Sequence, residues 1–244
     1  MNTETDGDFL SAAGGQKAAS SSFAVRPADE AEIDARLAKL TGRADGHALA
    51  GGTGKRTAAA IVILSLVGMY AALSLIMAEK TKLKSPGASL TCDLNPLIGC
   101  GKWIGTRVNE VVFGISNSVL GLAGFAALAA FGVALLGGAC LHRNIWRLLA
   151  AGACAAAVWV CWFMYQSFFV AHSLCPYCVL TWYISVPLIL LLWARCLQAG
   201  HCGARFVRGG EFLVRNYPVI LTAAYAALSA FILFYFWDKW MLLF

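Results

Sequence analysis

Cys175 and Cys178 form a Cys-Pro-Tyr-Cys motif at the entrance of an apolar segment that covers residues 179–194. Two thiols three residues apart at the start of a helix lie on one helix face, so they can close a small disulfide and reopen it. Because the apolar segment is suited to lipid, the motif should lie at the edge of a bilayer. A dithiol there can meet a lipid-soluble electron carrier on one side and a protein thiol on the other.

The start of a helix also activates a thiol. Pro176 suits the first helical position, where no amide donor is needed. The unpaired amides of the first turn stabilise negative charge, which lowers the pKa of a thiol at that site. We expect Cys175, nearer the water, to exchange with another cysteine pair and Cys178, one turn deeper, to face the carrier.

A second pair, Cys92 and Cys100, lies in the long connection between the first two apolar segments. Thiol–disulfide exchange proceeds by thiolate attack through a mixed disulfide, so two pairs within reach of each other can pass electrons. The alternative is a pair of static disulfides that brace the loop. For Cys175 and Cys178 this alternative is weak, because a disulfide that closes so short a loop stabilises little.

The other five cysteines receive no redox role: Cys140, Cys154, Cys161, Cys196 and Cys202. The two at 154 and 161 lie within an apolar segment and are expected to pack as small apolar side chains. The remaining three are expected on the cytoplasmic side in the reduced state. The spacing around His201 matches no zinc pattern, so no metal site is predicted.

The composition predicts an all-α integral membrane protein. The chain of 244 residues is 59% hydrophobic and 13% charged, whereas soluble domains are about 25% charged. The apolar runs are continuous and do not alternate, which excludes a strand barrel. Membrane-spanning helices are predicted over residues 57–78, 111–138, 148–170, 175–194 and 217–237.

The positive charges predict the topology. With the N-terminus in the cytoplasm, 13 of the 19 Lys and Arg residues fall on the inner side, as the positive-inside rule requires. The C-terminus and both cysteine pairs then lie outside. The net charge of +6 therefore orients the chain, and no basic stripe with interleaved aromatics indicates nucleic acid.

Two segments resemble the vitamin K epoxide reductase family. The first is Thr-Cys-Asp-Leu-Asn-Pro-Leu-Ile-Gly-Cys-Gly-Lys-Trp at 91–103, and the second is Phe-Gly-Ile-Ser-Asn-Ser at 113–118. The later Cys-x-x-Cys that opens the fourth span agrees with the same family. The resemblance covers about residues 58–193.

The resemblance implies a four-helix transmembrane bundle around a quinone, with the fifth helix peripheral. It implies that Cys178 reduces the quinone and that Cys175 exchanges with Cys100. Cys92 is then the residue exposed to the thiols of a partner. The quinone type, menaquinone or ubiquinone, is left open.

Four residues are expected to contact the quinone: Asn117, Ser118, Trp182 and Tyr183. Asn117 matches a family position that hydrogen-bonds a quinone oxygen, and capping or bridging of helices is the alternative. Trp182 stands where vertebrate members carry a tyrosine, so its indole would have to donate or stack instead.

His172 is considered as a proton source, with a plain interfacial histidine as the alternative. Trp103 and residues 104 and 108–115 are expected to form an amphipathic lid.

The implied function is a quinone-dependent thiol oxidoreductase that makes disulfides de novo. No fused thioredoxin-like domain is recognised, so the expected electron donor is a separate thioredoxin-fold oxidase on the outer face of the inner membrane. The alternatives are reduction of vitamin K epoxide or quinone proper, outward transport of reducing power, and a non-enzymatic membrane scaffold.

The sequence predicts four parts along the chain. They are a largely disordered cytoplasmic tail (1–56), the catalytic bundle (57–195) with its outer redox loop (79–110), a cytoplasmic loop (196–216), and the fifth span with a short outer C-terminus (217–244).

Overall fold

A computed structural model of the chain describes residues 41–85, 87, 90, 92–93, 98–106, 108–110 and 114–238. Most of the expected cytoplasmic tail, residues 1–40, lies outside the described residues. So do residues 94–97 of the loop signature and residues 111–113 of the expected lid.

Five helices are long and apolar enough to cross a membrane, which confirms the predicted all-α membrane fold. They are α3 (Lys55–Lys84), α4 (Asn117–Leu136), α5 (Arg143–Tyr165), α6 (Pro176–Gln198) and α8 (Tyr217–Tyr235). A π-helical turn, η1 (Gln166–Val170), extends α5. The described residues form no strand, and a backbone bridge outside the helices joins Ile98 to Leu174.

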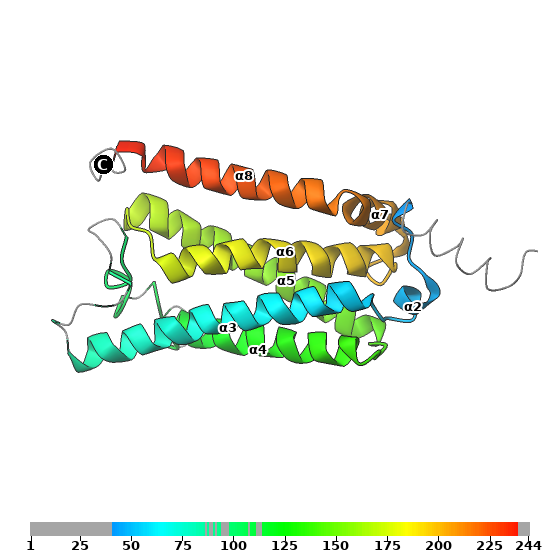
Figure 1. The fold of residues 1–244 in the computed structure, drawn as a ribbon, viewed down its shortest axis with the longest axis horizontal. Helices are drawn as coiled ribbons and strands as arrows, with labels where there is room; N and C mark the ends of the chain where they lie inside the picture. The colour runs from blue at the N-terminus through cyan, green and yellow to red at the C-terminus, as the bar shows by residue number, and fades with distance from the viewer. Residues whose placement is uncertain are drawn as a thin grey trace, which may run out of the picture.

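Helix α6 lies in the middle of the bundle and packs against α3, α5 and α8 (Figure 1). Helices α3 and α4 run closely side by side because small residues let them approach. A Cβ on Gly68 of α3 would come within 2.6 Å of the Phe125 ring of α4. The α8 helix lies along the outside of α6, in the peripheral position expected for the fifth span (Figure 1).

The second span begins later than predicted. Its expected start was residue 111, but α4 begins at Asn117 because Ser116 caps it. The Ser116 side chain accepts a hydrogen bond from the backbone N–H of Ser118. Gly114 precedes the cap in the left-handed region, with a φ of 73°. The described residues of the expected lid, 103–106, 108–110 and 114–115, contain turns and no helix.

The two ends of the bundle differ. The redox loop and the end of α8 lie at one end, and three short elements lie at the other (Figure 1). These elements are α2 (Gly46–Leu49), η2 (Ala204–Phe206) and α7 (Val207–Arg215). The segment expected to be a plain cytoplasmic loop after residue 195 therefore contains the last turn of α6 and two further helical elements.

The expectation that Cys196 and Cys202 stay reduced is wrong in this structure. The two sulfurs form a disulfide with an S–S distance of 2.10 Å. Gly200 and Gly203 adopt positive φ angles and turn the chain back under the end of α6. The backbone N–H groups of His201 and Cys202 both donate to the Cys196 carbonyl, which holds this turn closed.

Candidate functional site

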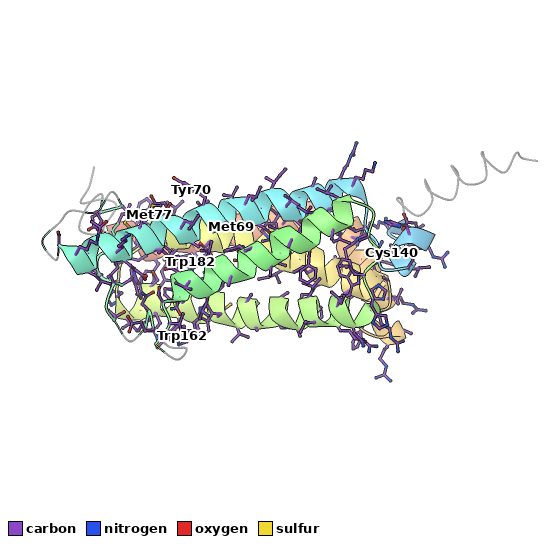
Figure 2. The ribbon with its side chains drawn as sticks, turned by 90° about the horizontal axis from the view of Figure 1, so that it is seen from below. Met69, Tyr70, Met77, Cys140, Trp162 and Trp182 are labelled. Carbon is purple, nitrogen blue, oxygen red and sulfur yellow. A yellow bond between two sulfur atoms is a disulfide. The ribbon has the colours of Figure 1, made fainter. Side chains whose placement is uncertain are left out.

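A cavity of about 600 Å³ lies between α3, α4, α5 and α6. Most of its wall is apolar, including Leu75, Phe125, Phe131 and Leu188. The carboxylate of Glu79 and the amides of Asn109 and Asn117 belong to the end that carries the redox loop. Figure 2 shows Trp182 toward that end of the bundle and Cys140 at the opposite end.

Three of the four predicted redox cysteines line this cavity: Cys100, Cys175 and Cys178. Cys100 is joined to Cys92 in a disulfide, and Cys175 and Cys178 are free thiols. The Sγ atoms of Cys100 and Cys175 are 3.2 Å apart, and both residues are buried. The two pairs are therefore in direct contact.

The loop is docked against the strand-like segment that precedes α6. The N–H of Gly99 donates to the Leu174 carbonyl at 2.9 Å, beside the bridge between Ile98 and Leu174. Asp93 Oδ1 accepts hydrogen bonds from the N–H of Cys100 at 2.8 Å and of Gly101 at 3.1 Å. These bonds hold Cys100 in place next to Leu174, the residue that precedes Cys175.

The expectation that Cys92 is exposed does not hold in the described residues. Cys92 is only 3% exposed and packs in a cluster with Ala78, Leu90 and Trp103. It is buried because the disulfide holds it against the end of α3. A partner thiol can reach it only if this part of the loop moves away from the bundle.

Cys175 is the N-cap of α6, and its surroundings favour the thiolate. The Cys178 thiol donates a hydrogen bond to Cys175 and lowers the pKa of the Cys175 thiol. The backbone N–H groups of Cys178 and Tyr177 lower the same pKa further, whereas burial and the charge of Asp93 oppose them. The net direction is downward, as the start of a helix predicts.

Asn117 and Ser118, both expected to contact a quinone, line the cavity at the start of α4. The Asn117 Nδ2 donates to the Val108 carbonyl at 2.9 Å, and its buried Oδ1 has no partner among the described residues. The Ser118 hydroxyl donates to a carboxylate, that of Glu79, at 3.4 Å. The capping alternative belongs to Ser116, not to Asn117.

Trp182 and Tyr183 lie on different faces of α6. Trp182 is buried, lines the cavity and packs against Phe168 with ring centroids 5.9 Å apart. Tyr183 lies outside the cavity lining, and its hydroxyl contacts Ser229 of α8. Adjacent helical residues are about 100° apart around the axis, so the face that brings Trp182 to the cavity takes Tyr183 away from it. Tyr183 is therefore not placed to contact a ligand there.

His172 also lies away from the cavity. It is exposed, with a φ of 45°, and its ring stacks on Tyr235 of α8. The Tyr235 hydroxyl is 3.2 Å from His172 Nδ1. This placement favours the interfacial role over the proton source.

Sequence reasoning missed Glu79, the only carboxylate among the described residues that line the cavity. Both of its oxygens accept from the Ser116 hydroxyl at 2.8 Å, and Oε1 also accepts from Asn109 Nδ2 and Ser118. The signal was present in the sequence, because Glu79 directly follows the apolar run of the first span. An ionisable residue inside a membrane-spanning helix usually has a function.

Trp103 supplies a second polar group that lacks a partner. Its indole is 7% exposed and packs on Phe163, with ring centroids 5.4 Å apart. Its Nε1 is buried with no hydrogen-bond partner in the described part of the chain, and the residue lines the cavity and packs in the same cluster as Cys100. Among the described residues, no group of His, Cys, Asp and Glu side chains could hold a metal ion.

The fold and the site define a multi-pass helical membrane protein with two touching cysteine pairs at the polar end of an apolar cavity. The chain belongs to the Vitamin K epoxide reductase family, whose sequence profile matches residues 59–193. The match runs from α3 to α6 and contains all four redox cysteines, Glu79 and Asn117. A search of curated protein sequences found no match. Members of this family are oxidoreductases associated with quinones, and the cysteine pairs agree with that class.

Proposed function

We propose that the protein oxidises the dithiol of a separate partner and passes the two electrons to a quinone. The observation that carries this proposal is the 3.2 Å distance between Cys100 Sγ and Cys175 Sγ, at the wall of a cavity that also contains Cys178. A static pair of disulfides requires neither the free Cys175–Cys178 dithiol nor its contact with the loop disulfide.

The exchange steps balance in electrons and protons. A partner thiolate attacks Cys92 of the Cys92–Cys100 disulfide, and the partner's second thiol completes a disulfide in the partner. The released Cys100 thiolate attacks the Cys175 sulfur of an oxidised inner pair and frees Cys178. Cys92 then attacks Cys100, which re-forms the loop disulfide and leaves Cys175 and Cys178 reduced. This last state is the one in the structure.

The cavity fits a quinone. Its volume of about 600 Å³ and its apolar wall suit a ring with an isoprenoid tail. At the polar end, the buried Trp103 Nε1 is an unused donor, and Asn117 has amide groups at the wall. A buried polar group without a partner is costly, so the Trp103 N–H suits a carbonyl oxygen of a quinone, and the Asn117 Oδ1 suits the hydroxyl of the quinol. The quinone, when bound, supplies the two-electron acceptor for the inner dithiol.

We assign the partner to the side of the membrane that carries the loop. A thioredoxin-fold oxidase has the dithiol chemistry that the Cys92–Cys100 disulfide requires. The distribution of Lys and Arg supports a cytoplasmic N-terminus, and the five spans then carry the loop and the C-terminus to the outer face of the inner membrane.

The test uses the full chain in proteoliposomes with a reduced thioredoxin-fold protein and a soluble quinone. We expect one quinol for each partner disulfide formed, and none with the Cys178→Ala variant. A parallel reaction replaces the quinone with its epoxide, because the family name includes that activity. Absence of quinol with every outer-face thioredoxin-fold protein tried contradicts the proposal, and turnover of the epoxide alone assigns the other family activity.

A further inference from the structure

Glu79 lies near the end of α3, at the wall of the cavity that also contains Cys178. Its carboxylate is held there by donors from three different places: Asn109 in the loop, the cap residue Ser116 and the α4 residue Ser118. The negative charge of Glu79 also acts on the Cys178 thiol. A carboxylate at the wall of a largely apolar cavity requires an explanation, because charged groups in such surroundings are costly.

The proposed reaction requires protons to move inside this cavity. When the inner dithiol becomes a disulfide, two S–H bonds break and one S–S bond forms. Two electrons and two protons must then reach the acceptor. Apart from Glu79, the titratable groups among the described lining residues are Cys175 and Cys178, because Cys100 is held in a disulfide. The exposed Glu110 lies outside the lining, and Asp93 is occupied with the backbone of Cys100 and Gly101.

We propose that Glu79 is the acid–base residue that carries a proton from the Cys178 thiol to a carbonyl oxygen of the bound quinone. The carboxylate takes the proton as the Cys178 sulfur gives up its electrons, and the carboxylic acid then donates it to the oxygen. Glu79 ends as it began and carries one of the two protons. The second proton passes from the Cys175 thiol to the other carbonyl oxygen, so the overall reaction remains the dithiol plus quinone giving disulfide plus quinol. This role rests on the proposed function, since it deepens the quinone step.

The competing explanation is purely structural. Through Ser116 and Asn109, Glu79 also ties α3 to the loop and to the start of α4, and the Asn109 carbonyl accepts the N–H of Asn117. In that case Glu79 acts only by positioning Asn117. The two roles differ in what happens when the charge is removed but the shape is kept.

The experiment compares Glu79→Gln with Glu79→Asp and with the matched control Glu110→Gln, which neutralises an exposed loop carboxylate outside the cavity. We expect Glu79→Gln to slow quinol formation by at least about 100-fold, the usual contribution of a general acid–base group, and to flatten its pH profile. Glu79→Asp should restore part of the rate, and the control should keep all of it. Quinone affinity, measured by quenching of tryptophan fluorescence, should stay within about threefold in all three variants, because proton transfer is not a binding interaction.

A retained pH profile, or a loss of quinone affinity that matches the loss of rate, overturns the acid–base role. Absence of quinol from the wild-type protein overturns both this inference and the proposed function, whereas normal wild-type turnover with a fully active Glu79→Gln variant overturns this inference alone.

Discussion

The Sγ atoms of Cys100 and Cys175 are 3.2 Å apart, although the residues are 75 positions apart in the chain. The contact is made by a short backbone pairing, in which the Gly99 N–H donates to the Leu174 carbonyl. It brings the Cys92–Cys100 disulfide into contact with the thiol of Cys175, the N-cap of α6, at the cavity wall. Exchange between the two pairs therefore needs only a change of sulfur partner, whereas access of another protein to the buried Cys92 needs the loop to move.

The Cys178→Ala variant should accumulate a Cys100–Cys175 disulfide. Without Cys178, the mixed disulfide cannot be resolved from the inner side, and the two sulfurs are already in contact. Mass spectrometry of the non-reduced protein measures the cross-link. Cys154→Ala is the control, since Cys154 is a free thiol on α5 and should not change the pattern. A variant that shows only the Cys92–Cys100 bond contradicts the direct exchange.

Replacing Asp93 should misplace Cys100. Asp93→Ala removes the acceptor of two backbone N–H groups, at Cys100 and Gly101. One of these bonds is partly buried and the other is exposed, and each contributes about 0.5–1.5 kcal/mol, so we expect exchange with Cys175 to slow by about tenfold. Asp93→Asn keeps Oδ1 and should retain most of the rate. The measurement is the rate of Cys100–Cys175 cross-linking in the Cys178→Ala background, and equal rates for both Asp93 variants would sink the idea.

The reactivity of Cys175 should depend on pH in a defined direction. Its pKa is lowered chiefly by the hydrogen bond from Cys178, and a thiol is ionised above its pKa. Alkylation of Cys175 should therefore reach its plateau at a lower pH than alkylation of an ordinary cysteine. In a Cys92→Ala/Cys100→Ala background, where Cys175 cannot form the cross-link, Cys178→Ala removes the largest cause and should move the midpoint upward. Iodoacetamide labelling followed by mass spectrometry of the Cys175 peptide gives the midpoint, and an unchanged midpoint in the variant would contradict this account.

The fold and the position of Cys175 at the start of a helix were predictable because their signals are local. Long apolar runs require helices in a membrane, and the Cys-Pro-Tyr-Cys spacing places two thiols at a helix start. Which residues of a helix face the cavity was less predictable. Trp182 and Tyr183 are neighbours in sequence, yet only the packing of α6 between the cavity and α8 decides that the first lines the cavity and the second contacts Ser229.

Glu79 was missed for a related reason. Its partners are Asn109, Ser116 and Ser118, which are 30 to 39 residues away, and only the close approach of α3 and α4 brings them together. Taken alone, Glu79 looks like the polar end of the first span.

The Cys196–Cys202 bond was mispredicted because the charge distribution places both residues on the cytoplasmic side, and that side was taken to decide their redox state. The turn at Gly200 and Gly203, which brings the two sulfurs together, was not considered.

The Cys196–Cys202 disulfide should stabilise the fold without serving electron transfer. It lies at the end of α6 opposite to Cys175, where Arg147 donates to the His201 carbonyl and Gln198 donates to the Gly42 carbonyl. A disulfide that closes a loop of about seven residues contributes about 2 kcal/mol, so Cys202→Ser should lower the melting temperature while quinol formation persists. Cys140→Ser is the matched control, because Cys140 is an exposed free thiol at the same end of the bundle. Thermal unfolding in detergent and non-reducing mass spectrometry measure the effect. Free thiols at both positions in the oxidised protein, or loss of quinol formation in Cys202→Ser at unchanged stability, would show that this bond is not a structural one.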